Sequence, residues 1–159
     1  MITFRSMCEN EYSAYLHYFI ADYAREIASN YRLSADDSLA RATQEIADDL
    51  PQGVNTPGQV LLCLMAESNN TNKHIGYLWY KPDTAMRTVF IYDFHVFNTF
   101  QGQGLGKDAL RAFEHDMRDK GVEQIRLRVA GDNQRARHVY EAIGFGVTGI
   151  NMSKSLKAS

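Results

Sequence analysis

The sequence has few of the residues that mark secreted, disordered or repetitive chains. It contains three prolines and two cysteines in 159 residues, and no low-complexity tract or internal repeat interrupts it. Cys8 and Cys63 stand far apart and form no CxxC motif, which argues against a disulfide scaffold and a zinc knuckle. We therefore expect both cysteines to be reduced thiols that pack like small apolar side chains.

Long hydrophobic runs and an excess of one charge are also absent. The longest apolar stretch, Val60 to Ala66, is much too short to span a bilayer, and the first residues lack the apolar core of a signal peptide. With 17 Lys and Arg against 19 Asp and Glu, the formal net charge is −2, too small to attract nucleic acid or an anionic membrane. We expect a cytoplasmic protein with no nucleic-acid or membrane partner, forming a single domain over residues 1–159.

Hydrophobic periodicity and turn residues predict an α/β fold with a mixed sheet. Helices are expected over residues 9–27, from an N-cap at Ser34 to residue 50, and over 104–120 and 133–143. In the second helix a buried stripe is expected at Leu39, Ala42, Ile46 and Leu50, and Gly121 is expected to end the third. Strands are expected over residues 2–4, 59–67, 74–80, 88–97, 123–129 and about 147–153. A polar turn over 68–72 would join the second and third strands.

Three glycines lie within five residues in the segment 96–107, which joins a predicted strand to a predicted helix. Such a junction leaves backbone N–H groups free at the helix N-terminus, a geometry that binds phosphate. A Walker A loop is excluded, because Gln101 stands where its first glycine belongs and Asp108 where its metal-binding hydroxyl belongs. A dinucleotide-binding fingerprint matches weakly, because the next predicted strand ends in Arg126 and Arg128 instead of a ribose-binding acid.

Two motifs follow one another in the second half of the chain. The first reads Gln101-x-x-Gly104-x-Gly106, and the second reads Asn133-x-x-Ala136-x-x-x-Tyr140-x-x-x-Gly144-Phe145. The first resembles the pyrophosphate-binding pattern Q/R-x-x-G-x-G/A of the GNAT superfamily of acyl-CoA-dependent N-acetyltransferases, and the second resembles that family's second signature, at the usual distance. The resemblance covers essentially the whole chain and implies a central mixed β-sheet flanked by about four helices. It also implies acetyl-CoA as cosubstrate and no metal.

The resemblance also assigns the cofactor to three segments of the chain. The backbone near Phe94, His95 and Val96 would pair with the pantetheine arm like an added strand. From the second motif, Asn133 and Ala136 would contact the cofactor, although Asn133 also suits an N-cap. The pyrophosphate would lie on the loop made by Gln101, Gly102, Gln103, Gly104, Leu105, Gly106 and Lys107.

Acetyl transfer from a thioester to an amine needs a neutral amine, a polarised carbonyl and a proton for the departing thiolate. An alkyl amine has a pKa of about 10, so it must lose a proton on or before binding. A backbone N–H near Phe94 to Val96 would polarise the carbonyl. In the GNAT pattern, Tyr140 is placed to protonate or hydrogen-bond the leaving sulfur.

The general base is expected on the strand before the glycine loop. Regular alternation would put Tyr92, Phe94 and Val96 on one face and Asp93 and His95 on the other, unless a bulge intervenes. Some relatives, including those resembling polyamine acetyltransferases, carry a Glu at the position of Tyr92, and this chain does not. The candidates are therefore Asp93, His95, or a water chain without a dedicated base.

The acceptor is expected to be a primary amine of a small molecule or of a peptide or protein. The first two helices and the loops 51–57 and 82–86 would form its site. An alternative of another class is a GNAT-fold domain that binds acyl-CoA as a sensor, with little turnover. A nicotinamide-dependent oxidoreductase is a second alternative. By analogy with the fold, a homodimer through exposed strand edges is also expected.

Overall fold

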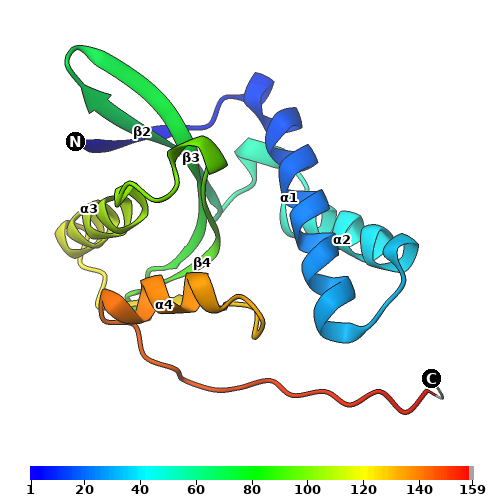
Figure 1. The fold of residues 1–159 in the computed structure, drawn as a ribbon. Coiled ribbons are helices and arrows are strands. Elements are labelled where there is room, and N and C mark those ends of the chain that lie inside the picture. The colour runs from blue at the N-terminus through cyan, green and yellow to red at the C-terminus, as the bar shows by residue number, and fades with distance from the viewer. Residues whose placement is uncertain (158–159) are drawn as a thin grey trace. The chain divides into compact units, whose positions relative to one another are not determined.

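One five-stranded mixed sheet and four α-helices make up the computed structural model, which describes residues 1–157 (Figure 1). The sheet has the order β1-β2-β3-β4-β5, in which β1 to β4 are antiparallel and β5 is parallel to β4. In chain order the elements are β1 (Ile2–Ser6), α1 (Glu9–Tyr31), α2 (Ala35–Asp49), β2 (Val60–Ser68), β3 (Thr71–Asp83), β4 (Thr88–Val96), α3 (Leu105–Asp119), β5 (Gln124–Leu127) and α4 (Gln134–Ala142). The predicted α/β class, with a mixed sheet and about four helices, is confirmed.

Contacts between residues divide the chain into two compact units. Unit 1 consists of Met1–Ser13 and Gln52–Arg128, and unit 2 of Ala14–Pro51 and Val129–Ser159. Unit 1 therefore holds the whole sheet and α3, whereas α2, α4 and the greater part of α1 belong to unit 2. Within the described part of the chain, no helix is both long enough and apolar enough to cross a membrane.

The core of unit 1 includes one side of α3. The buried residues recur at helical spacing and are Ala109, Leu110, Phe113 and Met117. The Phe113 ring meets Phe4 of β1 and Tyr80 of β3 edge to face, with centroid distances of 6.2 and 5.0 Å. Gly121 follows the helix with φ +81° and ends it as expected.

The hairpin of β2 and β3 is tighter than the sequence suggests. Ser68 pairs with Thr71, so only Asn69 and Asn70 form the turn, in place of the predicted five-residue turn. Both asparagines have positive φ, +49° and +63°. Two consecutive residues with positive φ form a two-residue hairpin turn whose twist matches that of the flanking strands. Asparagine adopts positive φ more readily than most residues. β3 is correspondingly longer than predicted, whereas β2 is shifted by one residue at each end.

Unit 2 has its own small core between α1 and α2. It contains Ala24, Ile27 and Ala42. The N-cap prediction is confirmed, because the Oγ of Ser34 accepts a hydrogen bond from the N–H of Asp37 at 3.0 Å. The prediction for Leu39 is wrong, since its side chain is 49% exposed. The buried stripe of α2 passes instead through Ser38, Ala42 and Ile46, one helical turn apart.

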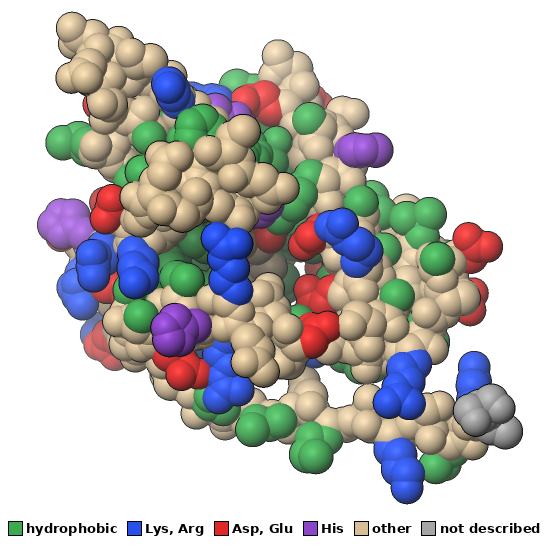
Figure 2. Space-filling view, in the orientation of Figure 1, with side chains coloured by type: hydrophobic (Ala, Val, Ile, Leu, Met, Phe, Trp, Pro, Cys, Tyr) green, Lys and Arg blue, Asp and Glu red, His purple; other side chains and the backbone are tan. Residues whose placement is uncertain are grey.

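The predicted last strand over 147–153 is wrong, because residues 145–156 have no regular secondary structure. A strand forms by pairing with a neighbour, and none of the described strands pairs with this segment. Its large apolar side chains are exposed, and Figure 2 shows hydrophobic groups along it. They belong to Val147, Ile150, Met152 and Leu156.

The two cysteines are free thiols, as predicted, but only one of them packs. Cys63 of β2 is fully buried, whereas Cys8 is exposed. Burial, followed by the negative charge of Glu11, raises the pKa of the Cys63 thiol to about 11. This thiol therefore stays protonated at neutral pH, and the packing expected of Cys8 is wrong.

An ion pair joins β1 to the first turn of α1 within unit 1. The guanidinium of Arg5 donates to both carboxylate oxygens of Glu11, at 2.8 and 3.0 Å, and the N–H of Cys8 donates to Oε1 at 2.9 Å. These hydrogen bonds, that of Arg5 first, lower the pKa of Glu11 from 4.5 to about 2. The lowered pKa stabilises the fold fully above about pH 4.5, and this stabilisation is lost as the pH falls toward 2.

We expect Arg5→Met to make the free energy of unfolding depend less on pH under acidic conditions. Without the guanidinium, the pKa of Glu11 in the folded state returns toward its ordinary value, so less stability is lost between about pH 4.5 and 2. Denaturant unfolding at a series of pH values, on the wild type and the variant, measures this difference. Equal slopes for the two proteins over this range would contradict the assignment.

Candidate active site

β4 contains a β-bulge in the middle of its candidate catalytic segment. Trp79 of β3 pairs with Asp93, but the next residue, Tyr80, pairs with Ile91, so Tyr92 is the extra residue. The ring of Tyr92 stacks on that of Trp79, with centroids 4.6 Å apart and an interplanar angle of 16°. Tyr92 therefore lies on the face of the sheet that Asp93 shares with Trp79, because the strand contains the bulge that the prediction made an exception for.

Beyond the bulge, β4 alternates as expected. Phe94 and Val96 point toward α3: their side chains lie 4.0 and 3.9 Å from the position that a Cβ on Gly106 would take. On the other face, Asp93 lies opposite Trp79 and His95 opposite Tyr77 in the ladder with β3. The two candidate bases thus share one face, and the two apolar residues face the helix that follows the glycine loop.

An aromatic group that the sequence analysis missed lies beside His95. The ring of Phe97 meets His95 at a centroid distance of 5.9 Å, and it also meets His74 and Tyr77 at 5.0 and 5.2 Å. Tyr77 and His74 are buried or half-buried on β3. No local pattern could have found this group, because the register between β3 and β4 brings it together.

The strands β4 and β5 part halfway along β4. Their parallel pairing runs from Thr88 with Gln124 to Ile91 with Leu127, where β5 ends, while β4 continues to Val96. Over the last part of β4 the ladder with β3 is kept. This geometry suits a ligand that binds as an extra strand beside the end of β4.

The glycine loop begins with a short 3₁₀ helix, η2 (Asn98–Phe100), and is held to the end of β4 by Gln101. The Nε2 of Gln101 donates to the carbonyl of Val96 at 2.8 Å and to the Oδ1 of Asn98 at 3.2 Å. Its side chain therefore shapes the loop. The Nε2 of Gln103 lies 3.5 Å from the carbonyl of Thr99 and restrains the loop at a second point.

Two glycines of the loop have backbones that other residues rarely adopt. Gly102 has φ +80°, and Gly104, the N-cap of α3, has φ +79°. A glycine cap offers no side chain to the first N–H groups of the helix, and those of Leu105, Gly106 and Lys107 have no acceptor inside it. The positive end of α3, with the exposed Lys107, can therefore accept a phosphate group.

The second motif lies in unit 2, on α4 and the residue before it. The Oδ1 of Asn133 accepts from the N–H of Ala136 at 3.1 Å, so this side chain is an N-cap. Tyr140 is half-buried, and its ring packs edge to face on Phe145 at 5.6 Å. Unit 1 thus brings together the candidates on β4 and the loop 101–107, and unit 2 carries Asn133, Ala136 and Tyr140.

A cavity of about 290 Å³ adjoins the second motif within unit 2. The residues that line it are Asp22, Arg25, Glu26, Ser29, Ala130, Asp132 and Asn133, of which three are acidic and one is basic. Arg25 is paired with Asp22 at 2.8 Å, and the hydroxyl of Ser29 donates to Asp132 at 2.6 Å. The carboxylates outnumber the single guanidinium, so the cavity would favour a cation.

Comparisons with known proteins agree on one family. The family model described as "Acetyltransferase (GNAT) family" matches residues 27–145. The uncharacterized N-acetyltransferase YycN of Bacillus subtilis is 34% identical over 152 residues, which cover 94% of this chain and 96% of YycN. The crystal structure of YycN has a TM-score of 0.90 at 32% identity and covers 99% of this chain and 100% of its own.

Two less similar proteins have named activities or ligands. The mycothiol acetyltransferase of Gordonia bronchialis is 34% identical over 93 residues, 58% of this chain and 30% of that protein. The structure of the PaiA N-acetyltransferase of Thermoplasma acidophilum, in complex with coenzyme A, has a TM-score of 0.68 at 15% identity. It covers 95% of this chain and 93% of its own, and at this identity the likeness concerns the fold.

Proposed function

The chain belongs to the acetyltransferase (GNAT) family, and from this premise we propose that it transfers the acetyl group of acetyl-CoA to a primary amine by direct attack in a ternary complex. Family membership makes it an acyltransferase. The observation that carries the proposal is the geometry of the segment from β4 to α3. β4 continues beyond the last residue of β5 and leads into a glycine loop at the N-terminus of α3.

The cosubstrate would use both parts of this segment. The pantetheine arm would pair with the backbone of Phe94 and Val96 beyond the last residue of β4 that pairs with β5. The pyrophosphate would accept hydrogen bonds from the N–H groups at the start of α3. The coenzyme A complex of PaiA, a protein of similar fold, supports this assignment.

In the proposed reaction, residues 1–159 would act as one acetyltransferase domain. Asp93 or His95, directly or through a water, would take a proton from the amine, whose nitrogen then attacks the thioester carbonyl carbon. A backbone N–H beside the bulge would stabilise the carbonyl oxygen as it becomes negative. When the carbon–sulfur bond breaks, the Tyr140 hydroxyl would give its proton to the departing thiolate. The attacking nitrogen would lose its remaining extra proton to solvent, and solvent would return a proton to Tyr140.

The cavity in unit 2 supports an amine as the acceptor. A primary amine is protonated in water at neutral pH. The carboxylates of Asp22, Glu26 and Asp132 would attract it in that form. The same cavity reaches Asn133, which the second motif assigns to the cofactor.

The turnover test uses acetyl-CoA with a panel of primary amines: polyamines, amino sugars, lysine analogues and peptides. Release of free CoA thiol, together with the mass of the acetylated amine, measures the reaction. We expect release that depends on both the protein and the amine. If coenzyme A binds but no amine gives turnover, the sensor alternative replaces the enzyme.

We expect Gly104→Ala to weaken the binding of coenzyme A by about tenfold or more. A side chain in the left-handed region costs roughly 1–2 kcal/mol, and the backbone can relieve this strain only by turning the N–H groups that would hold the pyrophosphate. Calorimetric titration of the wild type and the variant with coenzyme A measures the effect.

Gly121→Ala is the matched control for this substitution. Gly121 has φ +81° against +79° for Gly104, and neither position has an atom within 4 Å of an added Cβ. The two variants should therefore lose similar stability, but Gly121 lies at the other end of α3, so its replacement should leave the affinity for coenzyme A unchanged. Equal affinities of the two variants would place the cofactor elsewhere.

A further inference from the structure

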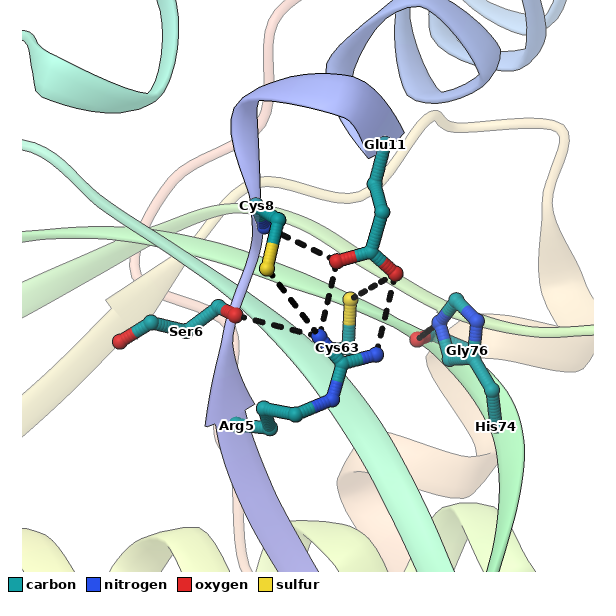
Figure 3. Close-up of polar contacts among 7 residues, drawn as sticks. All are labelled: Arg5, Ser6, Cys8, Glu11, Cys63, His74 and Gly76. Atoms are coloured by element: carbon teal, nitrogen blue, oxygen red, sulfur yellow. Dashed lines mark hydrogen bonds and ion pairs between the residues drawn. The ribbon is translucent and has the colours of Figure 1, made fainter.

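Three side chains with metal-binding atoms converge in unit 1, and one of them, His74, meets the same Phe97 ring as His95. They are Glu11 from the first turn of α1, Cys63 from β2 and His74 from β3. One ligand atom from each lies within 4.8 Å of the other two, and Figure 3 shows them pointing toward one another. We propose that this Glu11–Cys63–His74 cluster binds one divalent cation of the zinc type, and that the metal fastens the start of α1 to the sheet.

The set of donors selects this kind of metal. A thiolate, an imidazole and a carboxylate are the ligands of zinc, whereas magnesium and calcium prefer oxygen alone. With metal–ligand bonds of about 2.0–2.3 Å, tetrahedral geometry separates the ligand atoms by roughly 3.3–3.6 Å. The Sγ of Cys63 and the Oε2 of Glu11 are already 3.7 Å apart. A modest movement of the His74 ring would complete the three-ligand set, leaving the fourth position to water.

The metal would replace the thiol proton of Cys63. At present the thiol donates that proton to the Oε2 of Glu11, which also accepts from Arg5. On binding, the proton leaves to solvent, a sulfur–metal bond forms, and the lone pair of Oε2 that accepted the proton turns to the metal. One proton is therefore released for each metal bound.

A second layer of hydrogen bonds already orients two of the ligands, as metal sites generally require. Arg5 and the N–H of Cys8 hold the carboxylate of Glu11, and the Nε2 of His74 lies 2.9 Å from the carbonyl oxygen of Gly76. The guanidinium adds a positive charge near the metal. Because the side chain of Arg5 is 42% exposed, solvent screens this charge while the guanidinium keeps its hold on Glu11.

The test titrates Co²⁺ and Zn²⁺ into protein first freed of metal by a chelator and kept reduced. We expect one equivalent to bind, a thiolate-to-cobalt absorption band to appear, one proton to be released, and the melting temperature to rise with the zinc concentration. Cys63→Ser should abolish the band and weaken binding by at least roughly 10–100-fold. Cys8→Ser, which alters the exposed thiol outside the cluster, is the matched control and should bind normally.

A second variant keeps the test valid if Cys63→Ser unfolds, because the side chain of Cys63 is buried. His74→Gln keeps the thiolate but removes the imidazole, and it should weaken binding similarly. Melting temperatures without metal report whether each variant is folded. Absence of stoichiometric binding by the wild type, cobalt bound without the thiolate band, or an affinity that neither folded variant changes would overturn the proposal. Coenzyme A binding by the same preparations is a separate readout, so failure of the metal site leaves the proposed function untouched.

Discussion

Tyr140→Phe should lower kcat by roughly two to four powers of ten and leave the affinity for acetyl-CoA unchanged. The substitution removes only the hydroxyl that would protonate the departing thiolate. The ring, which packs on Phe145 at 5.6 Å, keeps its shape and its place on α4. Steady-state turnover with the best amine of the panel gives kcat, and calorimetric titration with coenzyme A gives the affinity.

Tyr31→Phe is the control, because it removes a hydroxyl from another exposed or half-buried tyrosine of unit 2. The ring of Tyr31 lies under the guanidinium of Arg41 at 5.3 Å, and phenylalanine keeps this contact. We expect wild-type turnover from this variant. A kcat of Tyr140→Phe equal to that of the wild type would show that another group, or water, protonates the sulfur.

Gly76→Ala should lower the free energy of unfolding by about 3 kcal/mol or more. A Cβ on Gly76 would lie 1.9 Å from the carbonyl oxygen of His95 and 3.1 Å from the Cα of Val96. Both neighbours are backbone atoms of β4, so no side-chain rotation relieves the overlap and the strands must separate. Activity should fall as well, because the pairing of β3 with β4 places Asp93 and His95 on their shared face.

Gly106→Ala is the matched control for stability. Its added Cβ would meet Val96 and Phe94 at 3.9 and 4.0 Å, which is ordinary van der Waals contact, and alanine suits a helix better than glycine. Denaturant unfolding of both variants measures the difference. A change of less than about 0.5 kcal/mol for Gly76→Ala would contradict the close approach of the two strands.

The helices were predictable because their signals are local. The cap at Ser34 and the buried stripe of α3 each follow from residues within a few turns of one another. Leu39 shows the limit of this reasoning, since the apolar spacing of α2 did not reveal that Ser38 lies on the buried side. The prediction of a strand over 147–153 was wrong for a related reason. Apolar residues form a strand only where another strand pairs with them, and the local sequence does not show whether one does.

The candidate site likewise has parts that local sequence patterns predict and parts that they do not. The loop 101–107 and the second motif are contiguous in sequence, and both were found there. The bulge at Tyr92 and the aromatic group around His95 depend on the register of β4 against β3, which no local pattern contains. The Glu11–Cys63–His74 cluster likewise joins residues from three elements, and strand pairing and the start of α1 bring them together.

Thermal unfolding with coenzyme A, acetyl-CoA, ATP and NAD, each in large excess, tests the central claim most directly. A ligand that binds only the folded protein, at about 100 times its dissociation constant, stabilises it by about 2.7 kcal/mol. The account predicts a raised melting temperature with coenzyme A and acetyl-CoA and none with ATP or NAD. No shift with either form of coenzyme A, or a shift with NAD alone, would contradict it.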